Sequence, residues 1–443
     1  MRTVPAAKAI SVVAASLMIC SLEECAHSAQ GDEYWDDQFA VLQFTGLGIG
    51  TIKMVGDSLY VGGTFRAIGG VSATNIAKWN GTNWSAFGTG LGTGDGDTVS
   101  ALAIWGDDLY AGGYFTNAGS QVMRNVARWD GTNWMTLASG VNAAGVYGIA
   151  EAPNGLVMAG AFDTAGGISA TNVAKWDGQN WSALDGGVQG TAYAIAASGQ
   201  DVYVGGRFNL AGGVAATNIA KWNGTNWSAL GFGVRIRSGG GGENGSVRAI
   251  AANGRDVYVA GGFSLAGSVA ANNVAKWNGA AWESLQGGVS IGSSLSAAAV
   301  CGNDLYVGGP FLSIGGVSAR GVAKWDGNTW SPLGSGTADN PPLALVSTGS
   351  ELILGGRFTV VGGKPSNKLA LWHIPHSLSI QRSGNNVTLS WPATGTNFLL
   401  EATSDLRAPN WQWVSSTPSI VNDQCVVTLP LGPDNQFFRL RRK

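Results

Sequence analysis

Short stretches in which hydrophobic and polar positions alternate recur along the chain, separated by turn residues. One complete set is an alanine-rich stretch at 192–196, a stretch ending in Gly-Gly at 201–206, one ending in Trp at 218–222, and one beginning with Trp at 227–230. Alternation over a few residues between Gly, Asn and Asp turns is typical of β-strands. The pattern predicts a repeating unit of four antiparallel strands.

The repeat is counted from a phenylalanine near the end of each second stretch. These residues are Phe65, Phe115, Phe162, Phe208, Phe263, Phe311 and Phe358. A tryptophan follows each of them by 14 residues, and in the first six units a second tryptophan follows five residues later. A fixed spacing inside units whose separation varies indicates blades joined by loops of different length. We therefore predict an all-β fold, a seven-bladed β-propeller.

The seventh unit ends at Trp372 without the second tryptophan, so its fourth strand is missing. Phe39-Ala40-Val41-Leu42 is similar to the Trp-Ser-Ala-Leu that begins at Trp181. Pairing both ends of the chain in one blade removes two open sheet edges. We predict that residues 39–42 supply this strand and that the ring is closed by an N-terminal strand.

Two local features have structural explanations. An Asn-Gly or Asp-Gly pair between the third and fourth stretches predicts a two-residue hairpin loop, with Trp79 opposite Thr82 and Ala77 opposite Trp84. The second Gly before each phenylalanine (Gly206, for example) marks a bulge or a close backbone approach. These tryptophans and glycines are interpreted as parts of the frame.

Residues 45–372 resemble kelch-type repeats, and more closely the propeller repeats of fungal cortical-marker proteins and of large secreted bacterial proteins. The Tyr-Val-Gly-Gly-x-Phe and Ala-Lys-Trp-Asp-Gly-x-x-Trp phrases carry the resemblance. Four residues separate the paired tryptophans, where kelch repeats tend to have Tyr and a longer gap. The resemblance implies a propeller that presents a binding surface.

Composition restricts the class of partner. Charged residues make up 12% of the chain, against about 25% in typical domains, and the net charge is −2. No basic footprint for nucleic acid follows from these values. Arg2 and Lys8 precede an apolar stretch and the small-x-small site Ala26-His27-Ser28, which predicts a signal peptide over 1–29. We expect a secreted or cell-envelope protein, at the bacterial cell surface or in the periplasm, monomeric and without a transmembrane segment in the mature chain.

The repeating pattern ends with the predicted propeller (30–375), and a different pattern of strands follows it. Alternating stretches at 386–392 and 397–401, the Ser-Trp-Pro phrase and the terminal Phe-Phe-Arg-Leu resemble a fibronectin type III domain. The segment 376–443 is therefore predicted to be a small β-sandwich. Its basic end is interpreted as a solvated strand end, with a sorting or anchoring role as the alternative.

Nothing in the sequence forms a convincing catalytic set. Two His remain after the signal peptide, His373 and His376, both at the domain junction, and most Asp residues stand at turns, where they have a structural role. We predict no catalytic residues, no metal ligands and no cofactor. The alternative is a hydrolase or lyase with an axial pocket, which two or more carboxylates around the channel would support.

Binding residues are sought where the sequence varies within the repeating frame. The residue before each phenylalanine varies and includes Thr64, Tyr114, Arg207 and Arg357. The longest separation between units holds an insertion with Arg235, Arg237, Glu243 and Arg248. Inserts in repeat proteins often form the binding face. A tolerated loop extension is the alternative for the insert. We expect a non-catalytic protein that recognises a protein or glycan, still unknown, on one propeller face.

Overall fold

The computed structural model describes residues 30–93, 96–142, 144–237, 245–289, 293–375, 378–393, 398–407, 409–422, 424–430 and 436–442. One compact unit covers Ser28–His373, and a second includes Ile374–Lys443. Apart from the 3-10 turn η1 (Asp32–Tyr34), the regular structure within these ranges consists of β-strands. The same ranges contain no helix long and apolar enough to cross a membrane.

The first unit is built from antiparallel sheets with four strands in chain order, and the last of these sheets has three. The innermost strands are β1 (Phe44–Val55), β6 (Thr98–Trp105), β12 (Gly145–Ala152), β18 (Val188–Ser198), β24 (Ser246–Asn253), β30 (Ala297–Cys301) and β36 (Pro342–Ser347). The second strands are β2 (Ser58–Ile68), β7 (Asp108–Tyr114), β13 (Gly155–Ala161), β19 (Asp201–Ala211), β25 (Asp256–Gly262), β31 (Asp304–Gly308) and β37 (Glu351–Gly356).

The outer strands are shorter. The third strands are β4 (Ile76–Trp79), β10 (Val126–Trp129), β16 (Val173–Trp176), β21 (Ile219–Trp222), β28 (Val274–Trp277), β34 (Val322–Trp325) and β40 (Leu369–His373). The fourth strands are β5 (Trp84–Ala86), β11 (Trp134–Met135), β17 (Trp181–Ala183), β22 (Trp227–Ala229), β29 (Trp282–Ser284) and β35 (Trp330–Pro332). Two-residue strands in the connections complete the unit, among them β23 (Val234–Arg235) and β26 (Leu265–Ala266).

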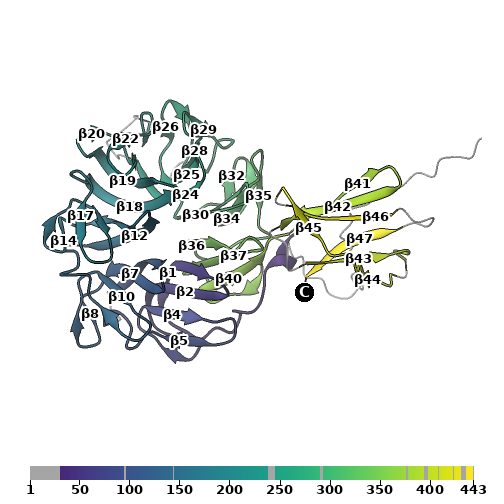
Figure 1. The fold of residues 1–443 in the computed structure, drawn as a ribbon, viewed down its shortest axis with the longest axis horizontal. Coiled ribbons are helices and arrows are strands. Elements are labelled where there is room, and N and C mark those ends of the chain that lie inside the picture. Colours follow the sequence, from purple (N-terminus) through teal and green to yellow (C-terminus); the bar gives the residue numbers. More distant parts are fainter. Residues whose placement is uncertain are drawn as a thin grey trace, which may run out of the picture. The chain divides into compact units, whose positions relative to one another are not determined.

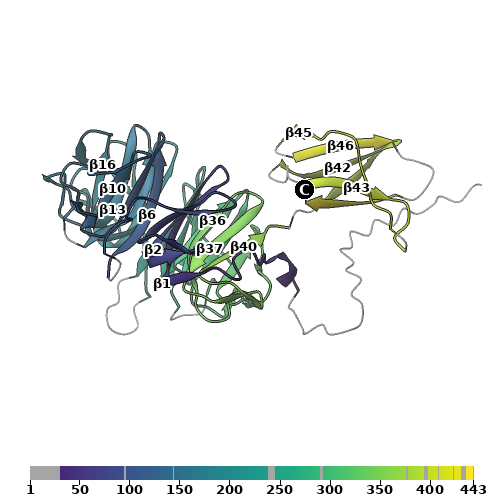
Figure 2. The same ribbon diagram turned by 90° about the horizontal axis from the view of Figure 1, so that it is seen from below.

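The sheets are arranged as the blades of a β-propeller. Figure 1 shows β12, β18, β24, β30, β36 and β1 around the middle, and β5, β17, β22 and β29 at the periphery. Each innermost strand contacts that of the next sheet, and β36 contacts β1. Figure 2 shows β1 and β2 beside β37 and β40, so the first and last sheets are neighbours. The all-β propeller predicted from the repeats is confirmed.

The hydrophobic core lies between neighbouring sheets. Val157 of β13, Val204 of β19 and Trp227 of β22 belong to one buried cluster. Equivalent clusters fill the other junctions, and Ile49 and Leu371 share the one between the first and last sheets. Because each sheet packs against a neighbouring sheet on either side, it carries apolar side chains on both of its faces.

The hairpin between the third and fourth strands differs from the prediction. Trp79 lies directly opposite Trp84, and Ala77 opposite Ala86, so the loop has four residues and not two. The Asn80 side chain makes the longer loop favourable, because its Oδ1 accepts hydrogen bonds from the Thr82 and Asn83 backbone N–H groups at 3.0 and 2.7 Å. The two indoles are 5.4 Å apart, directly paired and not diagonal.

The N-terminal segment meets the last sheet at a different residue from the one predicted. Residues 39–42 form a turn and not a strand. Trp35 forms an isolated antiparallel bridge with Trp372, and the Asp36 N–H donates to the Leu371 carbonyl at 2.9 Å. The Trp35 indole N–H donates to the Leu333 carbonyl, as the Trp330 indole N–H does to the Leu285 carbonyl. Trp35 therefore takes the place of the missing second tryptophan.

The second unit contains two sheets. One is β41 (Ser379–Ser383), β42 (Asn386–Pro392), β46 (Gln424–Pro430) and β45 (Ser419–Val421). The other is β44 (Gln412–Trp413), β43 (Phe398–Thr403) and β47 (Phe437–Arg442). Trp391 and Val427 from the first sheet and Leu400 from the second belong to one buried cluster.

Candidate functional site

The propeller unit has two ends that differ in their connections. In an antiparallel sheet of four sequential strands, the first and third connections lie at one end and the second lies at the other. We call the end with the turns at 199–200 and 223–226, and their equivalents, the turn face. The opposite end, with residues 212–218 and 230–237 and their equivalents, is the loop face.

The residues predicted from the variable position lie at the loop-face ends of the second strands. Each precedes a buried phenylalanine, such as Phe208, which is 3% exposed. Tyr114, Arg207 and Arg357 are exposed, and Thr64 is half-buried. A buried, repeated phenylalanine thus stands beside a more exposed, variable side chain at each of these four positions.

The described part of the predicted insertion, before residue 238, lies on the same face. Arg235 is half-buried in β23, which pairs with β26, and Arg237 is exposed, with its backbone N–H donating to Ser264 Oγ at 2.7 Å. Glu243 lies outside the described residues. Because β24 contacts β23, β18 and β19, the structure brings Arg235 and Arg207 to the same pair of sheets.

The remaining predicted residues lie on other sheets. A Cβ added to Gly48 of β1 would lie 2.8 Å from the Arg357 Cγ, and Gly48 pairs with Thr64. Arg357 and Thr64 are therefore neighbours, separated from Arg207 by the β24 and β30 sheets. Tyr114 belongs to the β6 sheet, which adjoins the sheet of Thr64, and it pairs there with Thr98. The predicted residues share a face but form two groups.

An asparagine that sequence reasoning missed positions the loop face in five sheets, and in four of them it is buried. These residues are Asn75, Asn125, Asn172, Asn218 and Asn273, all with positive φ. Asn218 accepts a hydrogen bond from the Phe208 N–H at 3.1 Å and donates through Nδ2 to the Val234 carbonyl at 2.8 Å. Asn tolerates the left-handed conformation better than most residues. Its ten-residue offset from phenylalanine is visible in the sequence.

A second missed feature is a bulge near the loop-face end of the innermost strands. The pairing of β18 with β19 shifts between Ala192 and Ala194, which leaves Tyr193 as the extra residue. Tyr147 and Arg248 occupy the same position in β12 and β24. All three stand 15 residues before their phenylalanine. A bulge commonly redirects a side chain at a sheet edge.

These three side chains contact one another across neighbouring sheets. The rings of Tyr147 and Tyr193 have centroids 6.1 Å apart at an interplanar angle of 34°. The Arg248 guanidinium carbon lies 5.3 Å from the Tyr193 ring centroid, within cation–π range. Burial raises the pKa of the Tyr147 phenol, and Tyr193 adds to the effect, so Tyr147 is a neutral hydrogen-bond donor near pH 7.

Cationic side chains form ion pairs with aspartates at one end of the unit, whereas among the described residues three arginines at the other end do not. On the turn face, second-strand aspartates pair with third-strand cations: Asp108–Arg128 (2.7 Å), Asp201–Lys221 (3.2 Å), Asp256–Lys276 (2.9 Å) and Asp304–Lys324 (3.1 Å). Within the described ranges, Arg207, Arg248 and Arg357 of the loop face form no such pair. Their guanidinium groups are available to an acidic ligand.

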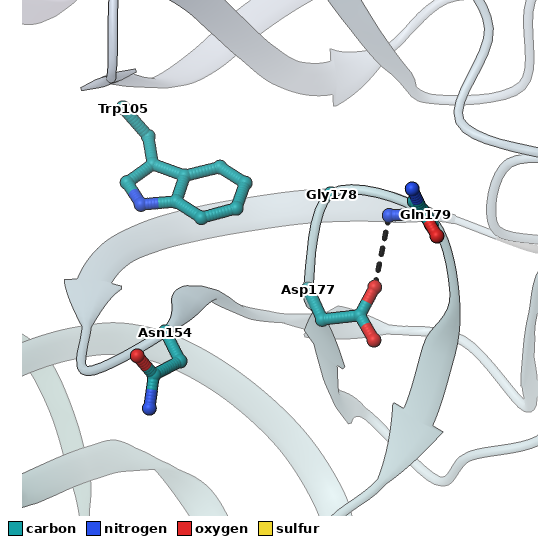
Figure 3. Close-up of a pocket in the computed structure, with 5 residues that line it drawn as sticks. All are labelled: Trp105, Asn154, Asp177, Gly178 and Gln179. Atoms are coloured by element: carbon teal, nitrogen blue, oxygen red, sulfur yellow. Dashed lines mark hydrogen bonds between the residues drawn. The ribbon is translucent and has the colours of Figure 1, made fainter.

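Two surface hollows lie near these features. One, of about 500 Å³ on the turn face, is lined by Trp105, Asn154 and the hairpin 177–179 (Figure 3). Backbone hydrogen bonds from Asn180 and Gln179 lower the pKa of Asp177, so its carboxylate has a turn-forming role. The other, of about 350 Å³, is on the loop face and is lined by Thr64, Leu47 and Arg66, among others.

The innermost strands, within the described residues, carry one carboxylate. It belongs to Glu151 of β12, and Lys53 Nζ of β1 lies 2.6 Å from its Oε1. No group of three or more His, Cys, Asp or Glu side chains in the described part of the chain is placed to hold a metal ion. The one carboxylate on these described strands is thus part of an ion pair.

Comparison with known proteins adds little. No family model matches the sequence, and no curated protein matches it. Among solved structures, YCF48 bound to a D1 peptide is 12% identical, with a TM-score of 0.45 over 77% of this chain and 95% of that one. The WD40 β-propeller domain of Doa1 is 10% identical, with a TM-score of 0.45 over 75% and 95% of the two chains. At these values the likeness has no bearing on function.

Proposed function

We propose that this protein is a non-catalytic binding or scaffold protein, secreted or held in the cell envelope, which recognises a protein or a glycan on its loop face. The observation that carries the proposal is the contrast at the loop-face ends of the second strands. The phenylalanines are buried and repeated, whereas Tyr114, Arg207 and Arg357 are exposed and differ between sheets. Side chains that the frame does not need are free to recognise a partner.

We infer that the sheets form a closed ring of seven blades. The contact between β36 and β1 and the bridge between Trp35 and Trp372 support this inference. A closed ring keeps its loop connections in fixed relative positions. Such rigidity lowers the entropy cost of binding, because the face need not be ordered when the ligand arrives.

A binding role is preferred over hydrolysis or elimination because two carboxylates that could serve in catalysis already have partners. One is on the innermost strands, and the other is at the turn-face hollow. Glu151 pairs with Lys53, and Asp177 accepts hydrogen bonds from its own turn. A general acid or base must be within reach of the proton that it transfers, with a pKa near the working pH. The pKa of Asp177 is instead lowered.

The rest of the proposal concerns the ends of the chain. We infer that the unit from 376 to 443 is a β-sandwich of the fibronectin type III kind, since its two sheets share one buried cluster. We also infer export through the 1–29 segment, and a monomeric state. Mass measurement of the chain recovered from the medium or envelope of an expressing cell tests the export step.

The binding proposal is tested with the full chain on a glycan array and in pull-downs from cell-surface extracts. The variant replaces Arg207 and Arg357 by Ala, and the matched control is Arg255→Ala, an exposed arginine of the turn face. We expect the loop-face variant to lose retention of the ligands that the wild type and the control retain. Equal retention by all three proteins, or loss in the control as well, contradicts the proposal.

A further inference from the structure

The bulged position of the innermost strands gathers an aromatic and cationic cluster on the loop face. Tyr147, Tyr193 and Arg248 come from three consecutive sheets and contact one another in series. Both tyrosines are half-buried and Arg248 is exposed. Arg207 lies on β19, which pairs with the strand of Tyr193 and contacts β24. The cluster therefore combines two aromatic rings with one guanidinium group.

The guanidinium of Arg248 is held by the ring of Tyr193 and not by a carboxylate of the described residues. A guanidinium placed over an aromatic ring keeps its N–H donors directed outward in its own plane. These donors match a carboxylate in a bidentate arrangement. The contrast with Lys221 and Lys276, whose charges are already paired on the turn face, indicates where an acidic ligand would bind.

The shape of the cluster favours a sugar over a peptide. A pyranose ring has an apolar C–H face and a polar rim, which suits two neighbouring tyrosine rings with the Arg248 guanidinium beside one of them. A peptide would gain most by pairing with the open edge of an innermost strand. The bulges interrupt that edge at this level in β12, β18 and β24, and bulged edges pair poorly.

We propose that Tyr147, Tyr193 and Arg248 form a binding site for a glycan that carries carboxylates, such as a chain of uronic acids. A sugar ring stacks on the tyrosines and its carboxylate binds the guanidinium of Arg248, with Arg207 and Arg235 extending the cationic surface. This assignment rests on the proposed loop-face binding function. It adds the class of ligand and the residues that contact it.

The test measures binding of a galacturonate tetramer to the full chain by calorimetry. A neutral galactose tetramer and a tetraglutamate peptide are the comparison ligands. We expect the galacturonate tetramer to bind and the neutral tetramer to bind at least about tenfold more weakly, since a charge-assisted hydrogen bond is worth that factor. Binding should also weaken as salt is raised.

Three variants separate the contributions of charge, geometry and ring. Arg248→Gln should weaken galacturonate binding about tenfold or more, and Arg248→Lys should restore only part of it, because Lys lacks the planar fork. Tyr193→Phe keeps the ring and should keep most of the affinity, whereas Tyr193→Ala should not. Arg255→Gln on the turn face is the matched control and should bind like the wild type. Unchanged circular dichroism in each variant shows that the fold is kept.

Each contrary result has a definite meaning. Absence of galacturonate binding, or equal binding by Arg248→Gln, overturns the site. Tetraglutamate binding as tightly, with the same dependence on Arg248, overturns the choice of a glycan. If another ligand depends on Arg207 and Arg357 but not on Arg248, the proposed function stands and this inference fails.

Discussion

Trp35 is the residue whose replacement tests the closed ring most directly. It lies before the first sheet in sequence, yet it bridges Trp372 in the last one. The Lys364 ammonium contacts its backbone carbonyl, and Gly362 lies against its indole. If these contacts close the ring, Trp35→Ala should destabilise the whole propeller and not only a frayed N-terminus.

The expected loss follows from the burial and hydrogen bonding of the side chain. Trp35 is 2% exposed, its ring packs edge-on against Trp372 with centroids 4.9 Å apart, and its indole N–H donates to the Leu333 carbonyl at 3.1 Å. Truncating a buried tryptophan to alanine costs about 3–5 kcal/mol. Trp35→Phe keeps much of the packing and loses the donor, which should cost about 1 kcal/mol from the hydrogen bond.

The assay is urea unfolding of the full chain, followed by far-ultraviolet circular dichroism. Trp330→Ala is the matched control, because Trp330 makes the equivalent hydrogen bond, to the Leu285 carbonyl, from a hairpin that is continuous in sequence. We expect similar shifts of the unfolding midpoint for Trp35→Ala and Trp330→Ala, and loss of the cooperative transition when residues 30–44 are deleted. An unchanged midpoint in Trp35→Ala, beside a lowered one in the control, refutes closure by this residue.

Two further predictions concern other parts of the chain. Asn218→Ala removes two buried hydrogen bonds and places Ala in the left-handed region, so it should lower the free energy of unfolding in urea by about 2–4 kcal/mol. Asn218→Gly should lower it by about 1 kcal/mol less. A loss no larger than that caused by Asn226→Ala, at an exposed asparagine, would contradict the role of Asn218. Burial raises the pKa of Glu401, but hydrogen bonds from Arg439 and Arg441 outweigh it and leave that pKa below its usual value. Stability from Glu401 is therefore present above its ordinary pKa of about 4.3 and is lost as the pH falls through the lowered value. Amide exchange in β43 and β47 of the wild type should accelerate as the pH falls through this lowered pKa. Equal acceleration in Glu401→Gln would refute the contribution of Glu401.

The frame of the propeller was predictable because it is encoded in fixed spacings. The interval of 14 residues from Phe208 to Trp222 recurs in every unit, and it corresponds to one connection between a second and a third strand. The hairpin register was not predictable from Asn80-Gly81 alone. That pair fits a two-residue loop, but the Asn80 side chain accepts two backbone hydrogen bonds and so stabilises a longer one. Side-chain hydrogen bonding overrode the dipeptide preference.

The position of the closing contact was missed for a related reason. The sequence Phe39-Ala40-Val41-Leu42 is similar to that of a fourth strand. In the structure, however, Phe39 packs against Trp79 much as Phe87 packs against Trp129. Phe39 thus occupies the place of the residue that follows a fourth strand. Three residues lie between Trp35 and Phe39, whereas two lie between Trp84 and Phe87. One extra residue was enough to hide the equivalence.

The candidate site shows which information a single sequence lacks. Tyr147, Tyr193 and Arg248 stand at a constant offset from the phenylalanines, so their position in the repeat was countable. Their significance depends on the bulge, which arises from pairing with the second strand, and on contacts between sheets that lie 46 and 55 residues apart in the chain. A propeller that reuses one frame can change its ligand only at positions that the frame leaves free. The bulged position and the one before each phenylalanine both meet that condition on the loop face, so a search for recognition should begin there.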